Sequence, residues 1–194
     1  MKQEHLDTAV IVAAMNNDTD KVMKFVRDGA NPDAVNDHQN TAIIMSAKRG
    51  NTDIIDFLVE NGADVNKQNW LGNCALIYAA GRENPNVVEN LLKHGASLNL
   101  FNKKRHNSLL LASWSGRLAT AKLLVDRGAD LDSLCGEGKT ALIWAALREQ
   151  DEVAAFLLHE GANADIRDQS GLTALEWASF MGNKSTCKIL SEHG

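Results

Sequence analysis

FLVENGADVN, at residues 57–66, contains a Gly-Ala pair that returns along the chain at a fixed interval. The pair begins at Gly29, Gly62, Gly95, Gly128 and Gly161, each 33 residues after the one before, and Gly194 ends the chain 33 residues later. A repeat of this length is the sequence signature of an array of stacked units. The 194 residues are therefore expected to form six such units.

Alignment of the chain at this interval brings similar residues together. A small residue recurs at Ala9, Ala42, Ala75, Ser108, Ala141 and Ala174, and a large apolar one follows it at Val10, Ile43, Leu76, Leu109, Leu142 and Leu175. In one unit, Ala141, Leu142 and Ala145 fall at helical spacing, which predicts a short inner helix with a small-residue face. A second apolar set, including Val153 and Leu157, predicts an outer helix.

Polar residues, glycine and proline mark the ends of these helices. Asn84-Pro85 is typical of a helix start, with Asn84 as the N-cap. Gly62 and its equivalents suit the end of the outer helix, where a left-handed residue closes the last turn. The polar residues that follow are expected to form the turn of a hairpin loop: Asp33, Asn66, Asn99, Asp132 and Asp165. Each unit is thus predicted as helix, turn, helix and hairpin loop.

Composition and charge exclude several classes of protein. Hydrophobic residues make up 44% of the chain, which is enough for a core. The net charge of −5 argues against nucleic-acid binding, which positive charge normally drives. No apolar run approaches the ~18 residues of a membrane-spanning helix, so we expect no membrane insertion. Three widely spaced cysteines favour reduced thiols in the cytoplasm, although an exported protein without its leader would look the same.

The chain carries no recognisable catalytic or metal-binding motif. Its six histidines share no metal-ligand spacing, and neither CxxC nor HExxH occurs. Cys187 stands in a column of small apolar residues and is predicted to be buried, whereas Cys135 is predicted to lie exposed in a hairpin loop. We therefore expect no catalytic residue, no cofactor, no metal and no enzymatic activity.

The repeat resembles that of the ankyrin family. The family's start, Gly-x-Thr-Pro-Leu-His-x-Ala-Ala, reads GNCALIYAA at residues 72–80 and GKTALIWAA at residues 138–146. Its end, Leu-Leu-x-x-Gly-Ala-Asp-x-Asn, matches residues 57–66. Alanine replaces the family's proline, and its histidine is replaced by Ile11, Ile44, Ile77, Leu110, Ile143 or Glu176. The family's Thr–His link between repeats is therefore expected to be absent, with packing in its place.

This resemblance covers essentially the whole chain and is nearest to bacterial ankyrin proteins. It implies an all-α ankyrin-repeat solenoid of six helix-turn-helix-hairpin repeats, a single domain over residues 1–194. The expected repeats are 4–35, 36–68, 69–101, 102–134, 135–167 and 168–194. Terminal repeats act as caps: Glu176 and Ser191 replace the apolar Ile143 and Leu158, and residues 2–5 replace a hairpin. We expect one complete array.

Ankyrin proteins generally bind other proteins through hairpin tips and the exposed ends of inner helices, which line a concave groove. The resemblance implies the same surface here, and at those positions this chain carries large apolar and basic residues. The predicted partner-binding residues are Lys48, Arg49, Trp70, Leu71, Arg82, Phe101, Lys103, Lys104, Trp114, Leu147, Arg148, Phe180 and Met181. Such a mixture is typical of binding hot spots and favours a protein partner with an acidic and apolar surface.

Alternatives remain open at this stage. The rings of Trp70 and Trp114 could merely pack between hairpins, and Tyr78, Trp144 and Trp177 are expected in the core. The favoured function is a non-catalytic adaptor, inhibitor or immunity protein of a bacterial effector or hydrolase, monomeric when free. A small-molecule or peptide sensor would use Trp70 and Trp114 as an aromatic cage, but an open solenoid lacks a deep cavity. A hidden enzyme is the third possibility, for which no residues are found.

Overall fold

The computed structural model describes residues 3–192, so Lys2 and Gly194, which entered the predictions for the caps and the glycine column, lie outside the described residues. Residues 3–192 form twelve α-helices, and the extended pairing described within them is one isolated bridge between Val35 and Thr41. The all-α prediction is confirmed. Contacts divide the chain into unit 1 (residues 1–79 and 84–102) and unit 2 (residues 80–83 and 103–194).

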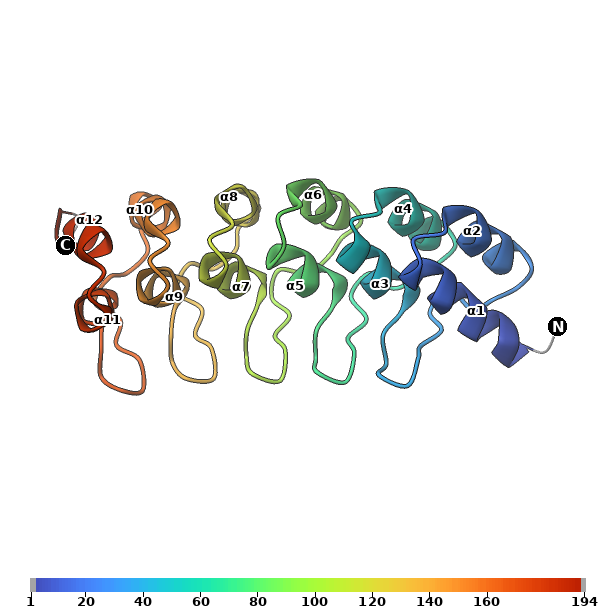
Figure 1. The fold of residues 1–194 in the computed structure, drawn as a ribbon, viewed down its shortest axis with the longest axis horizontal. Helices are drawn as coiled ribbons and strands as arrows, with labels where there is room; N and C mark the ends of the chain where they lie inside the picture. Colours follow the sequence, from blue (N-terminus) through green and yellow to red (C-terminus); the bar gives the residue numbers. More distant parts are fainter. Residues whose placement is uncertain (1–2, 193–194) are drawn as a thin grey trace. The chain divides into compact units, whose positions relative to one another are not determined.

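Unit 1 contains two rows of helices joined by long loops (Figure 1). Its helices are α1 (Gln3–Met15), α2 (Thr19–Arg27), α3 (Ala42–Arg49), α4 (Thr52–Glu60), α5 (Ala75–Ala80, whose last residue belongs to unit 2) and α6 (Pro85–Lys93). The inner helices α1 and α3 pack together, and the outer helices α2, α4 and α6 follow one another in the second row. Each repeat of helix, turn and helix therefore stacks on the next repeat.

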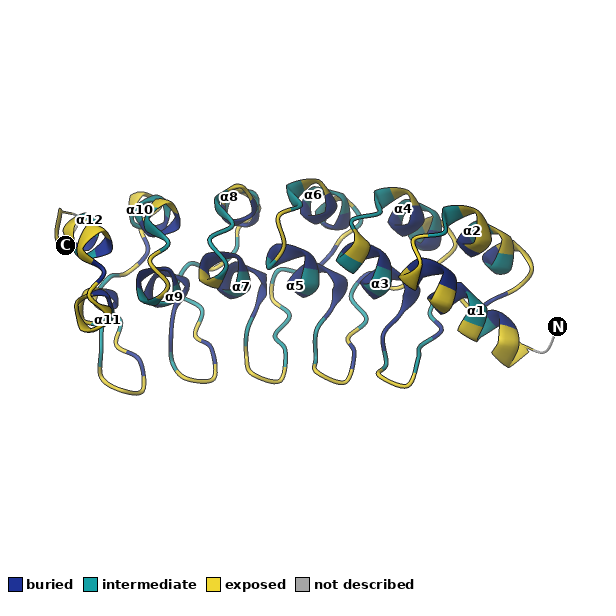
Figure 2. Ribbon diagram, in the orientation of Figure 1, coloured by how far each residue is buried: buried dark blue, intermediate teal, exposed yellow. Residues whose placement is uncertain are grey.

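Unit 2 repeats this arrangement. It consists of α7 (Ser108–Trp114), α8 (Leu118–Asp126), α9 (Ala141–Leu147), α10 (Asp151–His159), α11 (Ala174–Met181) and α12 (Lys184–Glu192). The inner helix α9 lies between α7 and α11, and the outer helix α10 lies between α8 and α12. Figure 2 shows the buried residues on the helix sides that face these neighbours and the exposed residues on the loops and outer sides.

The helices begin and end where the sequence pattern places them. The side chains of Thr41, Asn107, Thr140 and Thr173 each accept a hydrogen bond from a backbone N–H of the helix that follows. Asn84 caps α6 with Pro85 in the first turn, as predicted. Gly62 follows the end of α4 with φ of 90°, a left-handed conformation that suits glycine. Leucines that recur at one position of the outer helices are buried, including Leu58 and Leu124.

The polar residues after the glycines lie in the turns, as predicted, and some of their side chains also link neighbouring repeats. The turn is stabilised two residues earlier, where Asn31 Oδ1 and Asp64 Oδ1 accept hydrogen bonds from the backbone N–H groups of Asp33 and Asn66. Asp33 Oδ1 instead accepts from Asp64 N in the next repeat, at 3.0 Å. Asp132 makes the equivalent bond to Asn163 N. These carboxylates therefore link successive repeats, because each accepts a hydrogen bond from a backbone N–H group of the next repeat.

Packing and hydrogen bonds together replace the family's Thr–His link. Ile44 and Ile143, which occupy the histidine position, are fully buried, as the packing expectation requires. Neighbouring hairpins are also joined through their backbones: Trp70 N donates to His38 O in unit 1, and Gln169 N donates to Glu137 O in unit 2. The repeats are thus connected at the helices and again at the hairpin tips.

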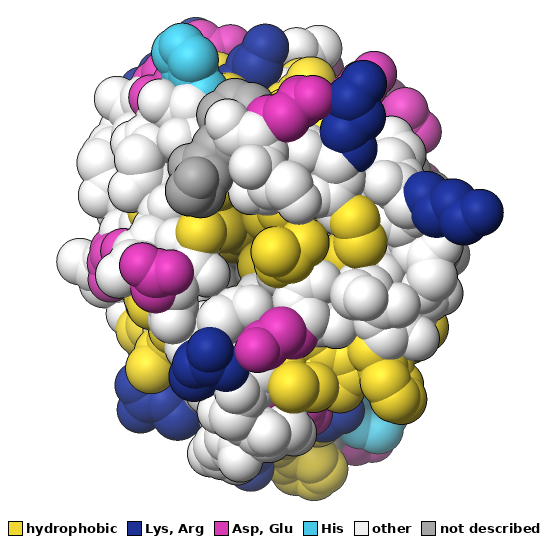
Figure 3. Space-filling model, turned by 90° about the vertical axis from the view of Figure 1, so that its left-hand side faces the viewer, with side chains coloured by type: hydrophobic (Ala, Val, Ile, Leu, Met, Phe, Trp, Pro, Cys, Tyr) yellow, Lys and Arg dark blue, Asp and Glu magenta, His cyan; other side chains and the backbone are white. Residues whose placement is uncertain are grey.

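The last repeat of unit 2 combines polar and apolar residues on its end face. Glu176 and Ser191 are exposed, as expected of a cap. Leu175, whose equivalents in the other repeats are buried, is 39% exposed. Figure 3 looks onto this end and shows hydrophobic side chains gathered in its middle and along its lower edge. The cap is therefore only partly polar.

Two predictions about cysteines are wrong. Cys135 is buried, because its sulfur lies inside the hairpin turn and accepts a hydrogen bond from Glu137 N. Cys187 is half-exposed, because within residues 3–192 no further outer helix packs beyond α12. Cys74 is buried, and burial raises the pKa of its thiol.

Core packing in unit 2 predicts a large difference between two leucines. Leu124→Ala removes a fully buried side chain of α8 and should lower the free energy of unfolding by about 2–5 kcal/mol through the cavity that it leaves. Leu134→Ala is the matched control, because that side chain is 43% exposed, and it should change stability little. Urea unfolding followed by circular dichroism measures both variants. Equal losses would contradict the assignment of Leu124 to the core.

Candidate partner-binding surface

Three of the inner helices each expose one aromatic residue that the sequence interpretation placed in the core. Tyr78, Trp144 and Trp177 are all half-exposed rather than buried, so that prediction is wrong. In α9, Ala141, Leu142, Ile143, Ala145 and Ala146 are buried and fill the side that faces the stack. Trp144 therefore shares the opposite side with Leu147 and Arg148, which follow it at i+3 and i+4. The same spacing relates Tyr78 to Gly81 and Arg82, and Trp177 to Phe180 and Met181.

In unit 1 the predicted residues lie at one hairpin tip and at the end of α3. Trp70 is 56% exposed, Leu71 is exposed beside it, and the Trp70 ring meets the edge of His38 at 6.0 Å. Phe101 is half-buried, and its carbonyl accepts a hydrogen bond from Gln68. Trp70 and Leu71 are therefore the large apolar groups that this unit presents to solvent at the tip.

The two basic residues at the end of α3 also hold neighbouring repeats together. Lys48 Nζ lies 3.9 Å from the centre of the Tyr78 ring. Burial alone would raise the pKa of the Tyr78 hydroxyl, but hydrogen bonds from Asn73 and Asn69 and the charge of Lys48 lower it overall. Arg49 Nε donates to the carbonyl of Met15 at 2.8 Å. These contacts fix both cations on the inner-helix side of unit 1.

Unit 2 brings together most of the predicted residues. Trp114 is 43% exposed, and the guanidinium of Arg148 lies over its ring at 5.2 Å. Phe180 is 77% exposed and meets Trp177 edge-on at 5.9 Å. Met181 is exposed and Leu147 is half-exposed. The predicted basic residues of this unit are all exposed: Arg82, Lys103, Lys104 and Arg148. We call this set, with Trp144 and Trp177, the inner surface of unit 2.

A cavity of about 330 Å³ opens within the inner surface of unit 2. Its apolar lining comes from Leu110, Leu111 and Trp114 of α7 and from Trp144 of α9. Its polar lining comes from two hairpins and consists of Lys104, His106 and Glu137. The imidazole of His106 meets the Trp144 ring edge-on at 5.9 Å. Burial and the charge of Lys104 lower the pKa of His106, although Glu137 has the opposite effect. The lowered pKa favours the neutral ring.

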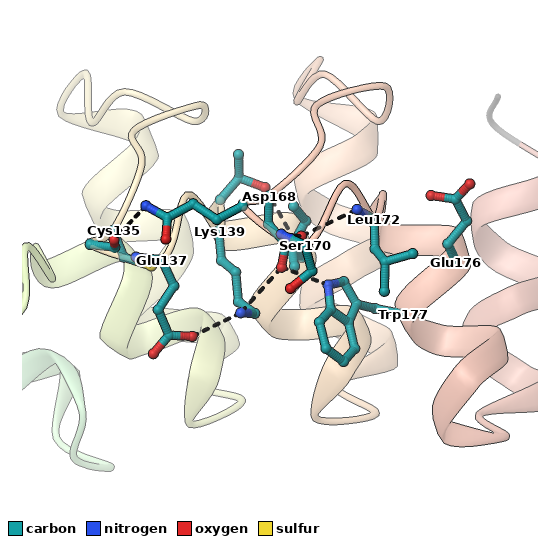
Figure 4. Close-up of polar contacts among 12 residues, drawn as sticks. Cys135, Glu137, Lys139, Asp168, Ser170, Leu172, Glu176 and Trp177 are labelled. Atoms are coloured by element: carbon teal, nitrogen blue, oxygen red, sulfur yellow. Dashed lines mark hydrogen bonds and ion pairs between the residues drawn. The ribbon is translucent and has the colours of Figure 1, made fainter.

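A network of ion pairs joins the hairpins on the C-terminal side of this cavity. Lys139 Nζ lies 2.8 Å from Glu137 Oε2 and 3.2 Å from Asp168 Oδ2, and its side chain points between the two carboxylates (Figure 4). Trp177 Nε1 donates to the same oxygen, Asp168 Oδ2, at 2.9 Å. Lys139 Nζ also lies within 5.5 Å of the centres of both the Trp144 and the Trp177 rings. Lys139 therefore positions two of the tryptophans of the inner surface.

The charges of this network stabilise one another. Burial alone would raise the pKa of Asp168, but hydrogen bonds from Trp177, Leu172 N and Lys139 hold that pKa below its usual range. Burial alone would lower the pKa of Lys139, but Glu137 and Asp168 raise it. Lys139 likewise lowers the pKa of Glu137, so Glu137, Lys139 and Asp168 are all ionised at neutral pH. The sequence pattern does not link Lys139 to Asp168, because the two residues stand 29 positions apart.

Two other kinds of site are not formed by the residues that the structure describes. No group of three or more His, Cys, Asp and Glu side chains within residues 3–192 is placed to hold a metal ion. In the same range, no helix is both long and apolar enough to cross a membrane.

The pKa of Asp168 yields a prediction for stability against pH. Asp168→Asn leaves Lys139 with a weaker partner and should lower the free energy of unfolding at pH 7 by about 1–3 kcal/mol. A carboxyl whose native pKa is depressed stabilises the fold above its unfolded-state pKa, about 3.9, and loses that effect as pH falls through the native value. The gap between wild type and variant should therefore shrink in urea unfolding at pH 3.

A matched variant and a contrary result complete this test. Asp165→Asn removes an exposed carboxylate from the preceding turn of the same loop and should change stability little at either pH. A gap for Asp168→Asn that is as large at pH 3 as at pH 7 would contradict the ionised network.

Comparison with known proteins agrees with this architecture. The family model described as ankyrin repeats (3 copies) matches residues 2–69, 67–135 and 109–194. Among solved structures, the crystal structure of EF0377, an ankyrin repeat protein, is similar to the chain with a TM-score of 0.88 and 31% sequence identity, over 96% of this chain and 98% of that one. The comparison with curated proteins finds no match. The helix pairs, the hairpins and these matches together show that the chain belongs to the ankyrin repeat family.

Proposed function

We propose that the chain is a non-catalytic binding protein that holds a partner protein on its inner helices and hairpin tips. Ankyrin repeats are generally protein–protein interaction modules, and the family is typically non-catalytic. The observation that carries the proposal is the exposure of Trp70 at a hairpin tip of unit 1 and of Trp114 and Phe180 on the inner surface of unit 2. Large apolar groups gathered on a water-facing surface mark interaction sites more often than idle surface.

The charges around these rings support a partner with an acidic and apolar surface. Arg82, Lys103, Lys104 and Arg148 are exposed in unit 2, although the whole chain carries a net charge of −5. A basic patch on an acidic protein steers acidic partners toward it and disfavours binding elsewhere. Arg148 lies over the Trp114 ring, so it offers charge and apolar contact at one place.

Finer aspects of this function are proposals that the sequence resemblance supports. An adaptor, an inhibitor or an immunity protein of a bacterial effector or hydrolase would each use such a surface, and a monomeric cytoplasmic form suits all three. An effector or hydrolase encoded next to this chain would favour the inhibitor. The alternative of an aromatic cage for a small cation is weaker, because Arg148 already covers one face of the Trp114 ring.

Affinity capture from the producing organism tests the proposal. The wild-type chain should retain a partner that mass spectrometry identifies, and Trp70→Ala/Trp114→Ala should lose it. With that partner purified, Trp114→Ala alone should weaken binding by about 2 kcal/mol or more in calorimetry. Its thermal melt should stay close to that of wild type, because the ring is partly in water. A Trp114→Ala variant that unfolds would place the ring in the core and remove it from the surface.

The basic residues predict an effect on association rate. Arg82→Glu should slow association with the same partner about tenfold at low salt and make the rate less dependent on salt. Lys184→Glu on α12 is the matched control, because it makes the same change of charge on an exposed outer helix. Stopped-flow or biosensor kinetics measure both variants. Equal rates for the two variants would show that Arg82 lies outside the interface.

A further inference from the structure

We propose that the cavity in the inner surface of unit 2 is an anchor pocket, which takes one large apolar side chain, aromatic or leucine, from an acidic segment of the partner protein. This inference rests on the proposed function and adds the chemistry of the segment that binds. It concerns the cavity bounded by α7, α9 and the two hairpins that carry Lys104, His106 and Glu137.

The size and lining of the cavity favour a single large side chain. Its volume of about 330 Å³ lies at the lower end of the range of about 300–1,000 Å³ that is usual for ligand pockets. Leu110, Leu111, Trp114 and Trp144 present mainly apolar surface to it. An aromatic side chain buries about 150–250 Å² on entering such a site and makes edge-to-face contacts with the rings.

The walls of the cavity are held in place before anything binds. Trp144 contacts two side chains: the His106 ring meets it edge-on at 5.9 Å, and Lys139 Nζ lies 5.5 Å from its centre. Lys139 is itself fixed by Glu137 and Asp168. The guanidinium of Arg148 lies over the Trp114 ring. A preformed pocket loses little conformational entropy on binding, which favours its use as an anchor.

The charges at the cavity determine which segment should carry the anchor. Lys104 is part of the lining, Lys103 and Arg105 flank it in the same loop, and Arg148 lies beside Trp114. Glu137 is the carboxylate of the lining, and its charge is already paired with Lys139 at 2.8 Å. Asp or Glu residues on either side of the anchor would therefore meet basic groups, whereas Lys or Arg residues would meet like charge.

Three synthetic peptides test the inference on the wild-type protein. The first has a central tryptophan flanked by Asp and Glu, the second replaces that tryptophan by alanine, and the third replaces Asp and Glu by lysine. The indole N–H signals of the four protein tryptophans are followed by NMR with nitrogen-15 in the protein only. The first peptide should shift the signals of Trp114 and Trp144 and leave Trp70 unchanged, with a Kd at least about tenfold below those of the other two peptides.

A cavity-filling variant gives a second, independent readout. Leu111→Trp adds a large ring to the lining from α7 and should weaken binding of the first peptide about tenfold. Val12→Trp is the matched control, because Val12 occupies the same repeat position on α1 and is exposed. Thermal melts check that both variants fold. Should Leu111→Trp fail to fold, the comparison of the three peptides on wild type still decides the matter.

Several results would overturn the inference. An alanine-centred peptide that binds as tightly would exclude the anchor, and a lysine-flanked peptide that binds as tightly would exclude the acidic segment. Unshifted signals of Trp114 and Trp144 at millimolar peptide would exclude the cavity. If a captured partner binds wild type and Leu111→Trp equally but not Trp70→Ala/Trp114→Ala, the pocket fails while the proposed function stands.

Discussion

Close contact between inner helices determines how the repeats stack, and the stacking determines which side chains face water. Ala42 and Ala75 in unit 1 and Ala141 and Ala174 in unit 2 are buried at the start of their helices, where a larger side chain would hold neighbouring repeats apart. Their smallness lets one side of a short helix pack fully against the stack. The opposite side of the same helix then faces water, and that side carries Trp144 and Trp177.

Hairpin contacts convert this stacking into a defined surface. A hairpin fixed by Asn69 or Asp168 presents its tip residues at a set distance from the inner helix, because the side-chain oxygens hold two backbone N–H groups of the turn. In unit 2 the network of Glu137, Lys139 and Asp168 extends that control to the tryptophan rings. A mainly hydrophobic core therefore supports a surface whose geometry is set by polar contacts, which is common where binding needs preformed shape.

The fold could be predicted from the sequence, because the interval of 33 residues repeats without insertion. Equivalent positions of successive repeats also have one physical role each. The exposed position of Trp144 was missed although helical spacing could have found it: Leu147 and Arg148, which were placed on the surface, stand three and four residues later. The ion pair of Lys139 with Asp168 and the hydrogen bond from Asp64 N to Asp33 Oδ1 could not be found in this way. Each contact joins residues about one repeat apart. Lys and Asp also occur in solvated loops that make no such contact, so the residue types alone do not indicate it.

Binding on the inner helices and hairpin tips can be tested by hydrogen–deuterium exchange of the chain with and without its captured partner. Exchange should slow on binding at the hairpin tips near Trp70 and Glu137 and at the ends of α7, α9 and α11, whereas α8 and α10 should be unchanged. Protection confined to α8, α10 and α12 would contradict this prediction, since those outer helices would then form the interface.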